Sequence, residues 1–293
     1  MLVRRKNSTV VPVLVAIVAT VAGISVAPVF AQAPPPLPPP QQLDQLVSRI
    51  ALYPDPLLAQ ILAAATFPDQ IPEAAAWADQ HHYLTGQALA SAIQADQLNF
   101  DPSVQALLPF PSVLEMMNSD MYWTNQIGNA FLVSQQAVMD SVQRERQASY
   151  RYGYLRSTPQ VVVTPGPYIS IAPVDPGYVV VPYYDPGVVF FPPRPGFVVG
   201  GAINFGFGVT IGGFFRPWGW GLARWDWGAH RVFINNAPWG RTWVNRATYA
   251  HPYEVRRYTA PPPPERHERI YRSPAEREAP RGGGRREEEH GRR

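Results

Sequence analysis

The amino-acid sequence predicts an α+β protein, in which an N-terminal acidic all-helical domain is followed by a region of short β-strands rich in proline, glycine and tryptophan. Apolar residues recur with a helical period up to about residue 156, and this period is lost after residue 159. The charge also changes sign, since residues 43–147 carry eleven acidic and three basic side chains, whereas residues 148–258 carry four acidic and ten basic ones. Opposite charges favour packing of the two regions against each other.

Residues 1–31 have the pattern of a signal peptide. Arg4, Arg5 and Lys6 precede an uncharged apolar stretch, and Val29-Phe30-Ala31 provides the residues that a signal peptidase needs for cleavage after Ala31. We therefore expect export to the periplasm or the extracellular space. The alternative is an uncleaved inner-membrane signal anchor, because the apolar stretch is nearly long enough to span a membrane.

Two further segments are predicted to lie outside the folded core. Residues 32–42 form a proline-rich linker of polyproline II type, and residues 259–293 form a disordered charged tail. Between them lie the helical domain, residues 43–158, and the Pro/Gly/Trp-rich β region, residues 159–258. The helical domain has enough aligned apolar faces to be expected to fold by itself.

Helix starts can be located from local chemistry. The first apolar face consists of Leu43, Leu46, Val47 and Ile50. Asp-Pro pairs at 55–56 and 101–102 each predict an N-cap followed by proline at the first helical position, and Pro111-Ser112 opens a third helix. The last helix is predicted to be long and to run from about Asp120 to Gln147.

Turn residues divide the β region. Strands are predicted around residues 161–163, 168–171 and 178–181, and they are separated by Pro/Gly turns that include Asp-Pro-Gly at both 175–177 and 185–187. In Phe197–Phe215, bulky apolar residues alternate with small ones, which predicts a strand with one apolar face and one glycine face. Membrane insertion of this uncharged stretch is the alternative.

Charge and cysteine content exclude several classes of protein. The net charge is +3, and Arg4, Arg5 and Lys6 account for all of it, so the chain without its leader carries 22 basic and 22 acidic residues. A neutral chain is not expected to bind nucleic acid. The sequence has no cysteine, which excludes disulfides, thiol catalysis and thiolate metal sites.

Several separate strings of residues agree in order and spacing with a known family. They lie at residues 50–64, 101–107, 110–114, 128–131, 181–189 and 225–228. Together they closely resemble the bacterial exported-protein family known as domain of unknown function 3300, over roughly residues 43 to 245. The resemblance implies an envelope-associated protein without an established activity, and it provides no catalytic residues.

A cluster of tryptophans and arginines is the candidate binding segment. The residues concerned are Trp218, Trp220, Trp225, Trp227, Arg224 and Arg231. Such side chains could bind a cell-wall glycan, an envelope protein or a membrane surface. We favour the alternative that they form core over the glycine-rich strand, although some indoles are expected to stay exposed. Trp218 with Trp220, and Trp225 with Trp227, should each lie on one side of an extended strand.

The sequence as a whole favours a non-enzymatic structural or binding component of the envelope, without a cofactor. The alternative is an envelope hydrolase or a metal-dependent enzyme that uses Asp226, His230, His251 and Glu254. Asp79, His81 and His82 form a second partial set of metal ligands. Neither set has a spacing that ensures convergence, and no nucleophile motif or phosphate-binding loop is present.

Overall fold

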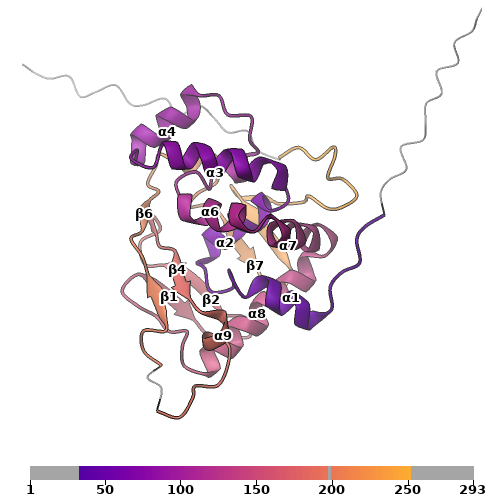
Figure 1. Cartoon of the computed structure of the whole chain (residues 1–293), viewed down its shortest axis with the longest axis vertical. Coiled ribbons are helices and arrows are strands. Elements are labelled where there is room, and N and C mark those ends of the chain that lie inside the picture. The colour runs from indigo at the N-terminus through magenta and orange to yellow at the C-terminus, as the bar shows by residue number, and fades with distance from the viewer. Residues whose placement is uncertain (1–32, 197–198, 252–293) are drawn as a thin grey trace, which may run out of the picture.

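The structure is a computed structural model that describes residues 33–196 and 199–251, and it confirms the α+β class. The leader, the tail 259–293 and Glu254 lie outside the described residues. Helices occupy the first part of the chain, and short strands with one short helix occupy the second. In Figure 1, β1, β2, β4 and β6 lie on the left and lower side, whereas β7 lies in the middle among the helices. The helices are α1 (Pro40–Val47), α2 (Asp55–Ala64), α3 (Ile71–Gln80), α4 (Gly86–Ala95), α5 (Pro102–Gln105), α6 (Pro111–Ser119), α7 (Met121–Val133), α8 (Gln135–Arg151) and α9 (Pro186–Val189).

The helices begin close to where the sequence predicts, but not every predicted N-cap residue caps its helix. Asp101 caps α5, because its side chain accepts a hydrogen bond from the Ser103 amide at 2.9 Å. Asp55 is the first residue of α2 and makes no cap; its carboxylate pairs with Arg146 at 2.6 Å instead. The first helix begins at Pro40, so the predicted linker is about three residues too long, since proline fits the first turn of a helix.

The predicted long helix is two helices. Ser134 lies between α7 and α8 with an extended backbone (φ −152°, ψ 97°), and its side chain accepts a hydrogen bond from the Ala137 amide at 3.1 Å. Serine therefore caps a new helix here, although its position fits the apolar face of a continuous one. The break lets α8 pack against α1, where Arg144 pairs with Asp44 at 2.6 Å.

The strands form four small antiparallel sheets in the described part of the chain. Their bounds are β1 (Val161–Thr164), β2 (Ser170–Pro173), β3 (Tyr178–Val179), β4 (Pro182–Tyr184), β5 (Ile203–Phe205), β6 (Val209–Thr210), β7 (Arg224–Asp226), β8 (Arg231–Ile234) and β9 (Ala237–Pro238). The neighbours are β1–β2, β3–β6, β4–β5 and β7–β8–β9. In both Asp-Pro-Gly strings the aspartate accepts a hydrogen bond from the glycine amide, at 2.7 Å and 2.8 Å. The first is a turn as predicted, but the prediction of a turn at 185–187 is wrong, because Asp185 caps the short helix α9 there.

The Phe197–Phe215 stretch contains two short strands, β5 and β6, which pair with β4 and β3. The predicted glycine face is confirmed, because a Cβ on Gly206 would lie 2.8 Å from the Tyr183 ring, and one on Gly208 would lie 2.4 Å from the Tyr178 ring. The prediction that the bulky residues share one apolar face is wrong, because Phe207 is 100% exposed whereas Ile211 is 1% exposed. Among the described residues, no helix combines the length and the apolar character needed to cross a membrane.

The hydrophobic core is continuous across the two parts of the chain. Residues of α2, α5 and α7 pack with residues of β2, β7 and β8 in one cluster. Two indole N–H groups reach from the second part into the first, from Trp220 to the Ala106 carbonyl at 2.9 Å and from Trp225 to the Asp55 carbonyl at 2.8 Å. The change of composition near residue 158 is therefore not a boundary between two cores.

Candidate functional site

The tryptophans at 218 and 220 lie in the core, not on a strand. Trp218 ends a short 3-10 helix (Arg216–Trp218), and Gly219 follows with a left-handed backbone at φ 88°, so the prediction of one extended strand is wrong. Both indoles are 1% exposed. Trp218 packs on Phe215 with ring centroids 5.8 Å apart, and Trp220 packs on Phe110 at 5.1 Å.

The second pair lies as predicted, on one side of β7. The Trp225 and Trp227 rings are stacked, with centroids 4.5 Å apart and an interplanar angle of 5°. Trp227 is 8% exposed and Trp225 is half-buried. The stack faces the protein, since the Arg146 guanidinium of α8 lies 5.0 Å from the centre of the Trp227 ring.

The arginines of this segment point away from the buried indoles. Arg224 lies over the Phe233 ring at 3.8 Å, and Arg231 is exposed opposite Asp226 in the β7–β8 ladder. The structure thus separates the six candidate residues, because Trp218, Trp220 and Trp227 are core, Trp225 is half-buried, and Arg224 and Arg231 are on the surface. The three buried rings have no face open to a sugar or a headgroup.

Asp226, His230 and His251, the described residues of the enzyme alternative, do not form one cluster. His230 pairs with Asp140 at 2.9 Å, and His251 pairs with Asp101 at 2.8 Å. Asp226 accepts a hydrogen bond from the Ala229 amide at 3.0 Å. Within residues 33–196 and 199–251, no group of three or more His, Cys, Asp and Glu side chains is arranged to hold a metal ion. The two histidines instead tie the strand region to two aspartates of the helical part.

The second partial set of metal ligands, Asp79, His81 and His82, lies beside a groove. His81 stacks on Trp77, with ring centroids 4.0 Å apart, and the His82 Nδ1 lies 2.5 Å from the Asp79 carbonyl oxygen. Neither arrangement is a metal site. Both histidines, however, line a groove of about 620 Å³ between the α3–α4 connection, the start of α6 and the strand β6.

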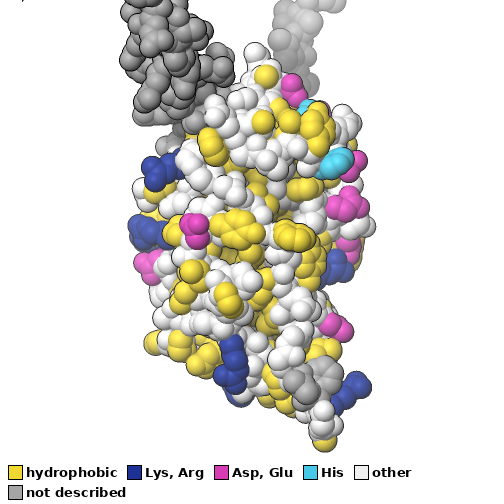
Figure 2. All heavy atoms as spheres, turned by 90° about the vertical axis from the view of Figure 1, so that its left-hand side faces the viewer, with side chains coloured by type: hydrophobic (Ala, Val, Ile, Leu, Met, Phe, Trp, Pro, Cys, Tyr) yellow, Lys and Arg dark blue, Asp and Glu magenta, His cyan; other side chains and the backbone are white. Residues whose placement is uncertain are grey.

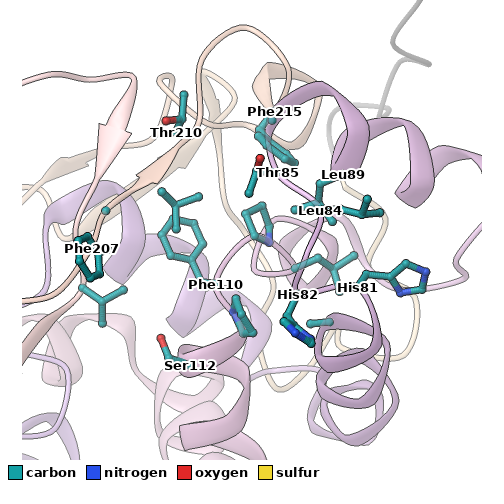
Figure 3. Close-up of a pocket in the computed structure, with 18 of the residues that line it drawn as sticks. His81, His82, Leu84, Thr85, Leu89, Phe110, Ser112, Phe207, Thr210 and Phe215 are labelled. Atoms are coloured by element: carbon teal, nitrogen blue, oxygen red, sulfur yellow. The ribbon is translucent and has the colours of Figure 1, made fainter.

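The groove is mainly apolar. Its walls include Leu84 and Leu89 from the helical side, Phe110 before α6, and Phe207, Val209 and Phe215 from the strand side. Figure 3 shows Phe207 and Thr210 on one side of the cavity and Leu84, Leu89 and His82 on the other. In Figure 2, which looks onto the β6 and α4 side of the molecule, hydrophobic side chains gather along the middle.

The polar lining of the groove consists of hydroxyls and the two imidazoles. The hydroxyls come from Thr85, Ser112, Tyr183 and Thr210, and the lining includes no Asp, Glu, Lys or Arg. A charged group placed here would lose its hydration without gaining a counter-ion, which is costly. The groove can therefore hold an uncharged, largely apolar ligand that accepts a few hydrogen bonds.

This groove could not be predicted from the sequence. Its lining comes from three stretches of the chain, residues 78–89, 108–112 and 181–215, which only the fold brings together. The string Gly206-Phe207-Gly208 was the one local indication of an exposed ring, because a large side chain between two glycines has little around it to pack against.

Comparison with known proteins agrees with the family resemblance. A family model described as "Protein of unknown function (DUF3300)" matches residues 39–239. The uncharacterized protein YacH of Escherichia coli (strain K12) is 34% identical over 182 residues, which is 51% of this chain and 29% of YacH. This chain thus spans less than a third of the length of that relative. No solved structure matches the chain.

Proposed function

Because the chain belongs to the DUF3300 family of proteins of unknown function, we propose a role from its sequence and its groove. We propose that it is an exported, non-enzymatic binding component of the bacterial cell envelope, and that the groove between α4 and β6 is its binding site. The groove takes the place of the Trp/Arg segment in this proposal, because Trp218, Trp220 and Trp227 are buried. Export rests on the leader pattern of residues 1–31.

The observation that carries the proposal is a concave apolar surface without charged side chains in its lining. Pockets of a few hundred Å³ with apolar walls and a few polar groups are typical of ligand sites. The exposed rings of Phe207 and Tyr183 supply contact area, and the hydroxyls can orient a ligand. The lining has no Asp or Glu, so it lacks the carboxylate pair that glycoside hydrolases use.

A fluorescent dye tests the binding site. Nile red is uncharged and apolar, and it becomes fluorescent when it enters an apolar cavity. We expect the purified protein to bind it and Ser112→Trp to lose most of that signal, because Ser112 is exposed on the groove wall and an indole there fills the cavity. Ser119→Trp, at the other end of the same helix and outside the groove lining, is the matched control.

The two variants must melt at similar temperatures for the comparison to hold. Equal dye binding by the protein and by Ser112→Trp would show that the groove is not the binding site.

N-terminal sequencing tests export. The protein isolated from the envelope fraction should begin at Gln32, since cleavage is expected after Ala31. An intact N-terminus on membrane-bound protein would instead identify the leader as a signal anchor, and recovery of the protein only from the cytoplasm would contradict the envelope role.

A further inference from the structure

The segment that precedes α1 is a neutral proline-rich arm, Ala33–Pro39. It has no helix or strand, and five of its seven residues are exposed. At the end of the arm, Pro39 has φ −61° and ψ 158°, which are polyproline II values. Figure 1 shows the arm leaving α1 and extending away from the helices. Nothing in the described chain covers most of its surface.

A polyproline II arm needs a partner surface with hydrogen-bond donors and flat apolar side chains. Proline has a carbonyl acceptor but no N–H donor, so its partner must supply donors and flat apolar contact. With three residues per turn, Pro36 and Pro39 lie on one ridge and Pro34 and Leu37 on another. All four of these residues are exposed. Such segments bind grooves lined by aromatic rings, at a low entropy cost because they are already extended.

The groove meets these needs. Phe207 and Tyr183, which are 100% and 53% exposed, provide open rings, and the hydroxyls of Thr85, Ser112, Tyr183 and Thr210 can donate to carbonyl groups. The charge also matches, since the arm has no charged residue and the groove lining has no Asp, Glu, Lys or Arg. Phe207 is 100% exposed at the groove, so a segment bound there would cover its ring.

The arm and the groove lie on opposite sides of the molecule. The arm leaves from the α1 and α7 side, whereas α4 and β6, which border the groove, lie on the other side (Figure 1). Seven residues in polyproline II conformation extend by only about 22 Å, at about 3.1 Å per residue. An arm that projects away from the body on one side is placed to reach a neighbouring molecule.

We propose that the groove takes the proline-rich arm of a second copy of this chain. This rests on the proposed function for the site, and it adds the identity of the ligand. The contact is heterologous, because the arm of one copy meets the groove of the next, so the copies form rings or open chains.

Analytical ultracentrifugation of the purified protein over a range of concentrations tests the proposal. We expect an average mass that rises with concentration to about twofold or more above that of the monomer. Two variants should each remain monomeric, Leu37→Ser in the arm and Phe207→Ser in the groove. Both replace exposed side chains, and Val244→Ser is the matched control, because Val244 is 92% exposed and outside the groove lining.

Mixing the two monomeric variants gives the sharpest result. Leu37→Ser keeps an intact groove and Phe207→Ser keeps an intact arm, so the mixture should contain a dimer that neither variant forms alone. A peptide of residues 33–41 should dissociate the assemblies, and the same peptide with serine at positions 36 and 37 should not.

A protein that is monomeric at all concentrations would overturn the proposal, as would assemblies that survive both substitutions. The proposed function is tested separately when Nile red binding is measured on the monomeric variant Leu37→Ser, whose groove is intact and has no arm to fill it.

Discussion

Arg146 is the residue that connects the helices to the strands most directly. Its side chain is 0% exposed, although it carries a charge. The guanidinium donates to the Asp55 carboxylate at 2.6 Å, to the Ile169 carbonyl at 2.9 Å and to the carbonyls of Ala51 and Tyr53. A buried charge is tolerated only when it is paired in this way. Burial raises the pKa of Asp55, and the adjacent Arg146 opposes that rise.

The first prediction concerns this residue. Arg146→Met should reduce the free energy of unfolding by about 3–5 kcal/mol, because it leaves a buried carboxylate and three carbonyls without their partner. Urea denaturation measures the loss. Arg144→Met is the control, since Arg144 lies on the same helix with a side chain 43% exposed, and exposed pairs contribute about 1 kcal/mol or less. Similar losses in the two variants would contradict the assigned role of Arg146.

Glu145 is expected to make the stability of the protein depend on pH. Burial, with the nearby Asp44 carboxylate as a smaller cause, raises the pKa of Glu145 from 4.5 to about 7. The folded protein therefore holds this proton at pH values where the unfolded chain has released it. The stabilisation is complete below about pH 4.5 and is lost as the pH rises through about 7.

Glu145→Gln removes this titration. The variant should lose less stability than the parent protein between pH 4.5 and pH 8. Its melting temperature should therefore rise relative to that of the parent as the pH rises. Thermal unfolding monitored by circular dichroism at four or five pH values measures it. A difference that stays constant with pH would show that Glu145 titrates normally.

At the scale of elements, Gly128 sets how closely α7 approaches α2. A Cβ at this position would lie 1.9 Å from the Ala65 carbonyl oxygen, at the end of α2. Glycine normally weakens a helix by roughly 0.5–1 kcal/mol relative to alanine. Here the close approach of the two backbones requires it.

At Gly128, replacement of glycine by alanine is expected to lower the stability of the protein, which is the opposite of its usual effect in a helix. Gly128→Ala should destabilise the protein by about 1–3 kcal/mol, although alanine is the better helix former, because the backbones must move apart. Gly213→Ala should be within about 0.5 kcal/mol of the parent, since no atom lies within 4 Å of its added Cβ. Chemical denaturation compares the two, and a stabilised Gly128→Ala would mean that the helices can separate at little cost.

At the scale of the whole molecule, the strand region completes the core of the helical region. Trp218, Trp220 and Trp225 donate to backbone or side-chain oxygens of residues 105, 106 and 55. Without these rings, α2 and α5 would expose apolar surface to water. The composition of the helical region suggests an independent unit, but the packing favours one cooperative molecule.

A fragment of residues 41–156 separates these two views. We expect it to keep helical circular dichroism but to melt without a cooperative transition, because the buried surfaces that meet the tryptophans would be solvent-exposed. The fragment 41–251 is the control and should melt cooperatively. A sharp transition in the shorter fragment would show that the helices form a sufficient core by themselves.

Much of the local structure could be predicted from the sequence, because its causes are local. The capping aspartate at 101, the Asp-Pro-Gly turn at 175–177 and the glycine face at 206 and 208 each depend on a few neighbouring residues. The long helix was mispredicted at Ser134, because a serine on an apolar face fits both a continuous helix and a capped break. Which of these forms depends on where the next helix can pack.

The sequence by itself determined the α+β class, the order of helices before strands and the membership of a family, because periodicity, turn residues and shared motifs are written along the chain. The tertiary structure alone decided the fate of the tryptophans, since a ring is buried or exposed according to what other segments lie against it. It also decided the candidate site. The groove joins residues such as Leu84, Ser112 and Phe207, which are far apart in sequence and have no pattern in common until the core brings them together.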